Sequence, residues 1–145
     1  MKIYNFIKIN STKDLEVSYK IRKKVFCEEQ KISKKIEFDN LDHLCEHFLI
    51  LKNKNYIATA RVRPKNKDIL KIERVAVLPE FRRLKVGSLL INEIIKFYFS
   101  GKKINSIILH SQVYVEAFYK SLNFKSYGDK FFEDGIPHIA MKYKL

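Results

Sequence analysis

The segment FRRLKVGSLL, residues 81–90, places basic side chains and a lone glycine at a predicted helix start. A strand ending at Leu78 and a helix beginning near Val86 would leave backbone N–H groups unpaired at the helix N-terminus. These donors and the helix dipole favour an anion. Positive charge is added at the same place by Arg82, Arg83 and Lys85. The segment therefore predicts a phosphate-binding site, with an ordinary helix start carrying solvated basic residues as the alternative.

Glycine is scarce in this segment, which keeps only Gly87. It is not a nucleoside-triphosphate loop, because the spaced glycines and the Lys-Ser/Thr pair are missing. An anion site of this kind uses backbone donors, and every residue except proline supplies a backbone N–H. At Lys85 we expect a right-handed or bridging backbone, since a left-handed one would cost lysine about 1–3 kcal/mol. The segment is then a variant phosphate cradle.

The elements around this segment follow from the periodicity of apolar residues. Strands are expected at residues 3–9, 47–51, 56–62, 70–78, 104–110, 124–127 and 138–143, with a hairpin turning at residues 53–55. Helices are expected from Ser11 or Thr12 onward, at residues 86–99 with an end at Gly101, and at residues 113–122. Residues 31–44 are polar and irregular. The order β-α-β-β-β-α-β-α-β-β predicts a mixed α/β domain that is not doubly wound.

Composition sets further bounds. A length of 145 residues fits one domain over residues 1–145, and 46% apolar with 13% aromatic residues argues against disorder. No apolar run reaches the length of a membrane span, and Lys2 and Lys8 argue against a signal peptide. Cys27 and Cys45 lack metal or disulfide spacing, which favours a reducing, cytoplasmic setting. The net charge of +13 indicates an anionic partner or a basic solvated surface.

Two segments resemble the GNAT superfamily of N-acetyltransferases. The family's pyrophosphate signature, Gln/Arg-x-x-Gly-x-Gly/Ala after an apolar strand ending in V-x-P, is similar to RVAVLPEFRRLKVGSLL. Arg82 stands first, Gly87 stands last, and Lys85 occupies the place of the first glycine. The family's N-x-x-A-x-x-F-Y-x-x-x-G-F resembles SQVYVEAFYKSLNF. In that match the Asn, Ala, Tyr and Gly correspond to Gln112, Val115, Tyr119 and Asn123.

A closer resemblance is to the bacterial acetyltransferases typified by the ElaA and YjcF proteins. It rests on IRKKVFCEEQ, on Asp39 and Asp42, on His47, and on GIPHIAM near the C-terminus. The two resemblances together cover essentially the whole chain. They imply the GNAT acyl-CoA N-acyltransferase fold, acetyl-CoA as co-substrate, and no metal.

Acetyl transfer from a thioester to an amine must hold the thioester, remove an amine proton and stabilise the leaving thiolate. The resemblance implies that the strand at residues 72–78 follows the pantetheine arm and that the Val77 N–H polarises the acetyl carbonyl. Tyr119 would protonate the departing sulfur, because a phenol of pKa about 10 lies above a thiol of about 8.5; a core tyrosine is the alternative. The implied cofactor contacts are Val75, Ala76, Val77, Arg82, Arg83, Leu84, Lys85, Val86, Gly87, Ser88, Gln112 and Tyr119.

The base that takes the amine proton is open between Glu73 and His138. Glu73 could instead be a solvent-facing residue paired with Arg74 or Lys71, and His138 a structural histidine. The acceptor side implied by the resemblance comprises Glu28, Glu29, Asp42, His43, His47 and His138. For the two glutamates, which end the first helix, a solvated helix end is the better interpretation.

The pentapeptide HLCEH, residues 43–47, matches the H-x-x-E-H pattern of some zinc peptidases. That chemistry needs both histidines on one helical face. His47 instead begins the strand pattern HFLIL, so we expect no metal site here.

These observations predict a GNAT N-acetyltransferase that transfers the acetyl group directly within a ternary complex. Neither cysteine shows an activating histidine or a helix-start setting, which disfavours an acetyl-enzyme. The positive charge favours a small anionic amine, such as glucosamine phosphate, although CoA is itself an anion. A protein lysine or N-terminal acetyltransferase is the nearer alternative. A basic nucleic-acid-binding module is the other, disfavoured because the aromatic residues follow core periodicity. A homodimer is left open, and no membrane partner is expected.

Overall fold

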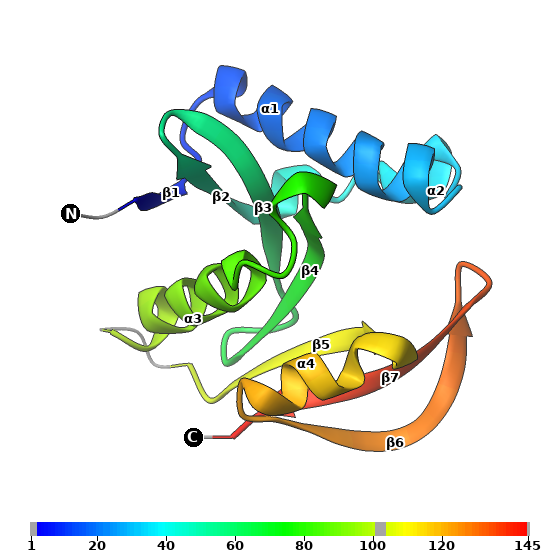
Figure 1. Ribbon diagram of the computed structural model, residues 1–145. Helices are drawn as coiled ribbons and strands as arrows, with labels where there is room; N and C mark the ends of the chain where they lie inside the picture. The colour runs from blue at the N-terminus through cyan, green and yellow to red at the C-terminus, as the bar shows by residue number, and fades with distance from the viewer. Residues whose placement is uncertain (1–2, 101–103, 145) are drawn as a thin grey trace.

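The computed structural model describes residues 3–100 and 104–144, which form a seven-stranded sheet with helices on both faces (Figure 1). The strands are β1 (Tyr4–Lys8), β2 (Glu46–Lys52), β3 (Asn55–Pro64), β4 (Ile69–Val77), β5 (Ser106–Gln112), β6 (Phe124–Glu133) and β7 (Ile136–Tyr143). The helices are α1 (Thr12–Arg22), α2 (Lys34–Glu37), α3 (Val86–Phe99) and α4 (Glu116–Ser121), and α1 continues into a π-helix, η1 (Lys23–Glu29). The described 3-10 turns are η2 (Asp42–Leu44), η3 (Pro79–Phe81) and η4 (Val113–Val115).

The predicted order of elements, and with it the mixed α/β class, is confirmed. Ser11 caps α1 by accepting a hydrogen bond from the Asp14 N–H at 3.2 Å. The strand predicted at residues 124–127 is longer, because β6 continues through a register shift after Tyr127 and ends at Glu133. The helix end predicted at Gly101 lies outside the described residues; α3 ends at Phe99. In the described part of the chain no helix combines the length and apolarity needed to cross a membrane.

Both faces of the sheet are buried, because alternate residues of one strand point to different helices. On β2, Phe48 and Ile50 belong to one core cluster together with Leu90 of α3. Leu49, between them, packs instead with Ile21 of α1. The sheet therefore has α1 and η1 on one face and α3 and α4 on the other (Figure 1).

The sheet opens between two of its central strands. Its order is β1-β2-β3-β4-β5-β7-β6, and β4 and β5 pair in parallel. Their ladder ends at Ile72 and Leu109, yet β4 continues to Val77 and β5 to Gln112. β4 stays attached to β3 through a bulge, at which Arg74 has a φ of 57°. The C-terminal halves of β4 and β5 therefore diverge.

Buried ion pairs fix the polar segment between α1 and β2. The Arg22 guanidinium, 1% exposed, donates to Glu37 at 2.7 Å and to Asp42 at 2.8 Å. Arg61 of β3, also 1% exposed, donates to Asp39 and Asp42, each at 2.9 Å. Removing one partner from such a network leaves an uncompensated buried charge and costs about 3–5 kcal/mol. The network therefore holds α2 and η2 against the sheet.

Candidate active site

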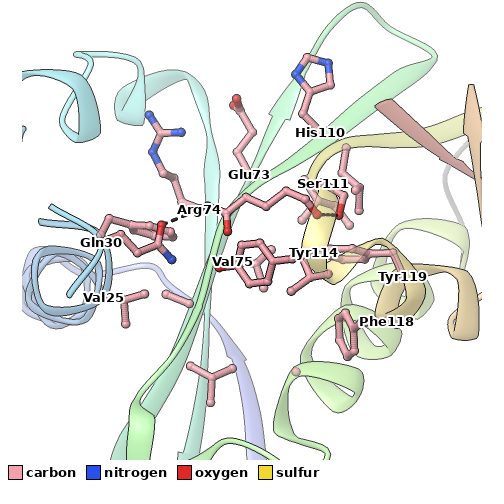
Figure 2. A pocket seen from close by; sticks show the side chains of 18 of the residues that line it. Val25, Gln30, Glu73, Arg74, Val75, His110, Ser111, Tyr114, Phe118 and Tyr119 are labelled. Carbon is pink, nitrogen blue, oxygen red and sulfur yellow. Dashed lines mark hydrogen bonds between the residues drawn. The ribbon is translucent and has the colours of Figure 1, made fainter. Parts of the chain in front are cut away.

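A cavity of about 640 Å³ occupies the gap between the diverging strands (Figure 2). Its walls come from η1, β4, residues 81–88, the end of β5, η4 with α4, and the β6–β7 hairpin. His138 of β7 pairs with Gln112 of β5, so both side chains lie on one face, where Gln112 donates to Gln30 beside η1 at 3.0 Å. Tyr119 of α4 belongs to the core on the opposite face. The cavity thus has walls from both faces of the sheet.

The end of the cavity nearest α3 offers backbone donors. α3 begins at Val86, without a side-chain cap, and the Lys85 carbonyl accepts from the Leu89 N–H at 3.0 Å. The first N–H groups of the helix, including those of Gly87 and Ser88, have no partner within the helix. A Cβ at Gly87 would lie 3.2 Å from the Phe118 ring, so glycine permits the close approach of α3 to α4. This end can hold an anion.

The prediction of a right-handed or bridging backbone at Lys85 is wrong. Lys85 has φ 63° and ψ 20°, a left-handed conformation, and Arg83 also has a φ of 63°. The chain turns from η3 into α3 within four residues, and these left-handed residues make the turn. A glycine would adopt this conformation without a Cβ penalty, whereas lysine carries a strain of about 1–3 kcal/mol. The position that departs from the family signature in this loop is therefore a strained one.

Arg82 is held in place by two partners. Its Nε donates to the Val77 carbonyl at 2.9 Å, and its terminal nitrogens donate to both Glu29 carboxylate oxygens at 2.6 and 2.9 Å. These hydrogen bonds lower the pKa of Glu29 and raise that of Arg82. In the described residues, Arg83 and Lys85 are the lysines and arginines of the cavity without an ion pair. The free positive charge at this end therefore comes from these two residues.

The middle of the cavity combines a backbone donor with a phenol. The Leu78 N–H donates to the Ile57 carbonyl at 2.9 Å, so the alternation of strand hydrogen bonds turns the Val77 N–H toward the edge that β5 has left. Tyr119 is 8% exposed and lines the cavity, and burial raises the pKa of its hydroxyl. Its hydroxyl has no hydrogen-bond partner among the described residues. It stays protonated near neutral pH and can donate to a ligand.

Glu73 lies among cations on the α1 side of the cavity. Arg63 Nε donates to its carboxylate at 2.7 Å, and Lys71 Nζ lies at 3.3 Å. Burial alone would raise the pKa of Glu73, but the hydrogen bond from Arg63 and the charges of Lys71 and Arg61 outweigh it and lower the pKa to about 2. A carboxylate of this pKa is a weak base near neutrality.

His138 lines the cavity, and one of its ring nitrogens makes no hydrogen bond to a described residue. Its Nδ1 lies 2.7 Å from the Ile136 carbonyl oxygen, which can only accept, so Nδ1 donates and Nε2 carries the lone pair of the neutral ring. Nε2 lies 3.6 Å from the Glu133 carboxylate, and that carboxylate also lies 3.2 Å from His110 Nδ1. Its interaction with His110 lowers the pKa of Glu133. His138 is thus placed to accept a proton, with a carboxylate beside it.

The structure brings together most of the predicted site residues. Tyr119, Glu73, His138 and Glu29 line the cavity, as do all the predicted cofactor contacts except Leu84, which is half exposed. Gln30, His110, Ser111 and Glu133 also line it but are not predicted. One signal was available, because His110 lies two residues before Gln112 on the same strand and therefore on the same face.

Four predicted acceptor residues lie outside the cavity: Glu28, Asp42, His43 and His47. Glu28 is exposed, and Asp42 is occupied by Arg22 and Arg61. The His47 ring is buried and makes a 2.9 Å hydrogen bond to the Asp42 carbonyl. His43 lies in η2 and His47 in β2, so HLCEH is not one helix. Within the described residues no group of three metal-ligating side chains forms a site.

The chain is similar to known proteins over most of its length. A family model described as an acetyltransferase (GNAT) domain matches residues 11–145. YyaT of Bacillus subtilis is 34% identical over 147 aligned positions, which cover 97% of this chain and 96% of YyaT. ElaA of Escherichia coli is 31% identical over 134 positions, which cover 90% of this chain and 88% of ElaA. The predicted resemblance to ElaA is thereby confirmed.

Solved structures share the fold. A crystal structure from Lactobacillus plantarum has a TM-score of 0.89 at 24% identity and covers 98% of both chains. A GNAT family acetyltransferase from Elizabethkingia anophelis with acetyl-CoA bound has a TM-score of 0.77 at 15% identity and covers 100% of both. At these identities the likeness establishes the fold.

The strain at Lys85 can be measured with two variants. Lys85→Gly removes the charge and the strain, whereas Lys85→Ala removes the same charge and keeps the left-handed Cβ. We expect Lys85→Gly to be more stable than Lys85→Ala by about 1 kcal/mol in denaturant unfolding. Both variants should bind acetyl-CoA modestly more weakly than the wild type, most clearly at low salt. Equal stability of the two variants would show that Lys85 carries no strain.

The ion pairs of Glu73 predict a pH-dependent stability. The folded pKa of about 2 lies below the ordinary carboxyl value of about 4.3, so the stabilisation is complete above pH 5 and is lost as the pH falls through 2. We expect Glu73→Gln to lower the free energy of unfolding at pH 7 by on the order of 3 kcal/mol. The difference should shrink steadily between pH 5 and pH 2. Denaturant titrations of both proteins measure it, with Glu80→Gln, an exposed carboxylate, as the control. A difference that does not change with pH would contradict the assignment.

Proposed function

Because this chain belongs to the GNAT acetyltransferase family, an acetyl-CoA-dependent family, we propose that its cavity transfers the acetyl group of acetyl-CoA directly to a small primary amine. The observation that carries the proposal is the opening between β4 and β5, which has anion-binding backbone donors on one face and a free histidine nitrogen on the other. A thioester and an amine can thus approach the same point from opposite sides of the sheet.

The end of the cavity at α3 fits the cofactor's phosphates. The N–H groups of Gly87 and Ser88, with the charges of Arg83 and Lys85, would hold the pyrophosphate. The free edge of β4 offers hydrogen bonds to the pantetheine amides. The cofactor supplies the activated acetyl group. The protein orients it along β4, where the Val77 N–H is directed at the gap.

The chemical step needs one base and one acid on opposite sides of the acetyl group. His138 Nε2 would take the amine proton as the nitrogen attacks the thioester carbon, and the Glu133 carboxylate stabilises the imidazolium that results. The carbon–sulfur bond then breaks, and the Tyr119 hydroxyl would protonate the sulfur. Glu73, with its three cationic neighbours, has the weaker claim to the base role.

Direct transfer is supported by the state of the thiols. Neither Cys27 nor Cys45 lines the cavity, and burial raises the pKa of Cys45 to about 11. A thiol of this pKa is protonated near neutrality and is a poor nucleophile.

The proposed acetyl transfer is tested by measuring the release of CoA from acetyl-CoA in the presence of diamines, monoamines, amino sugars, amino-sugar phosphates and lysine peptides. If calorimetry detects no binding of acetyl-CoA at tens of micromolar cofactor, the proposal is contradicted.

Tyr119→Phe should separate chemistry from cofactor binding. The substitution removes the proton donor and keeps the ring packing, so we expect kcat to fall by roughly a hundredfold while the Kd for acetyl-CoA changes little. Stopped-flow CoA release and calorimetry measure the two quantities. Tyr114→Phe is the matched control, because Tyr114 also lines the cavity but is 73% exposed. An unchanged kcat would return Tyr119 to a packing role.

His138→Gln should remove the base and leave the cofactor site intact. The amide keeps a polar side chain but cannot take the amine proton, so we expect kcat to fall by roughly a hundredfold while the Kd for acetyl-CoA changes little. Stopped-flow CoA release and calorimetry measure the two quantities. His43→Gln, at an exposed histidine outside the cavity, should keep the wild-type kcat. If kcat is unchanged in His138→Gln, the base is another group, and Glu73→Gln is the next variant to measure.

A further inference from the structure

The cavity wall on the α1 side is acidic although the whole chain carries a net charge of +13. We call this wall the acceptor end and define it by its charged and titratable residues. They are Glu37, Lys71, Glu73, Arg74, His110, Glu133, Asp134 and His138. Four carboxylates therefore face two permanent cations. Figure 2 shows Glu73, Arg74 and His110 directed away from the side on which Phe118 lies.

Both permanent cations of the acceptor end are already paired. Lys71 Nζ lies 3.3 Å from the Glu73 carboxylate. Arg74 lies 3.1 Å from Glu37 and 3.2 Å from Asp39. Among the described residues, no lysine or arginine at this end is left to bind a phosphate or a carboxylate. An anionic acceptor, which the net charge favours, would meet carboxylates here without a free counter-charge.

Two carboxylates of the acceptor end lack a permanent cation. Glu133 contacts His110 and His138, which are charged only when protonated, and its side chain is 41% exposed. Asp134, the next residue in the β6–β7 turn, is exposed and has no ion pair within the described chain. Figure 1 shows this hairpin rising on the side of the sheet where α1 and α2 lie. Both carboxylates are available to a ligand.

A second observation points to a ligand at the same place. The His138 side chain is 8% exposed, yet its Nε2 has no hydrogen-bond partner among the described residues, because Glu133 lies 3.6 Å away. A ligand that donates a proton to Nε2 would supply the hydrogen bond that the described residues do not give it. The Nε2 atom and the Glu133 carboxylate lie side by side, and Asp134 follows Glu133 in the chain.

We propose that the acceptor is a small aliphatic diamine or polyamine. This inference rests on the proposed acetyl transfer. One amine lies at His138 and is acetylated, while the second remains protonated and binds the carboxylates of Glu133 and Asp134. In the reaction, a nitrogen–carbon bond forms and the carbon–sulfur bond breaks. The proton leaves the attacking amine for His138 Nε2, and Tyr119 donates a proton to the thiolate. Glu133 is the residue that determines specificity for the second charge.

The preference can be measured as a ratio of kcat/KM values. CoA release is followed with 1,4-diaminobutane, with butylamine, and with glucosamine 6-phosphate. We expect kcat/KM for the diamine to exceed that for butylamine by about tenfold at low salt, because the second ammonium can form exposed ion pairs with two carboxylates. The ratio should fall as salt screens the charges. Glucosamine 6-phosphate should be the poorest of the three.

Glu133→Gln should reduce the diamine-to-butylamine ratio to near the statistical factor of about two that two equivalent amines give. The ratio is the chosen quantity because Glu133 also contacts His138, so kcat can fall for every acceptor. Asp134→Asn, which does not touch His138 in the structure, should reduce the ratio as well. Asp129→Asn is the matched control: Asp129 is an exposed β6 carboxylate that does not line the cavity, and its variant should keep the wild-type ratio.

The outcomes separate the two proposals. Absence of CoA release with every amine would overturn the proposed function. Turnover with butylamine or glucosamine 6-phosphate that equals or exceeds turnover with the diamine would leave acetyl transfer intact and overturn the diamine acceptor. Wild-type ratios in both Glu133→Gln and Asp134→Asn would also overturn it.

Discussion

The short parallel ladder between β4 and β5 is the constraint on which the site depends. The pairing ends at Ile72 and Leu109, and from there each strand leads to a different helix, β4 to α3 and β5 to α4. β4 cannot follow β5, because its bulge keeps it paired with β3 up to Val77. The divergence exposes the backbone groups of one strand edge, which would otherwise be saturated by the neighbouring strand. The opening therefore creates both the cavity and its hydrogen-bonding capacity.

Charge is distributed in this molecule by pairing, and the net charge does not describe the site. Three arginines, Arg22, Arg61 and Arg74, are paired with carboxylates of residues 37–42. Free positive charge in the cavity is confined to the start of α3, and free negative charge to the β6–β7 turn. The site therefore has a gradient of charge from one face of the sheet to the other. The net charge of the whole chain does not report this difference between the two ends of the cavity.

The elements were predictable because their signals are local. Apolar alternation predicts the strands, and the Ser11 cap marks the start of α1. The end of β6 was not predictable, because Gly128 and the polar residues after it break the alternation while the strand continues through a register shift. The left-handed backbone of Lys85 is imposed by the turn between η3 and α3, and lysine itself carries no signal for it.

The residues that line the cavity were predictable from sequence near the start of α3 and less so at the acceptor end. Sequence motifs mark the helix start and Tyr119, whose neighbours are close in the chain. Asp42 and His47 belong to the motifs that carry the family resemblance, yet both stabilise the fold. Asp42 pairs with Arg22 and Arg61, and His47 makes a hydrogen bond to the Asp42 carbonyl. Glu133 reaches the cavity only because β6 and β7 fold back on each other, which places it beside His138. The contact between Glu133 and His138 depends on how β6 and β7 pair, and the spacing of residues in the sequence does not reveal it.

The π-helix η1 sets the angular phase of the residues that close the gap between the two strands. The Gln30 N–H donates to the Val25 carbonyl five residues earlier, so each hydrogen-bonded turn of this segment spans one residue more than in an α-helix. The end of η1 reaches both sides of the opening: its last residue, Glu29, binds Arg82, and the next residue, Gln30, binds Gln112. Deleting one residue from η1 would restore an ordinary helix and rotate everything beyond the deletion by roughly 100°. The π-helical hydrogen bonding of η1 therefore orients Glu29 toward Arg82 and Gln30 toward Gln112.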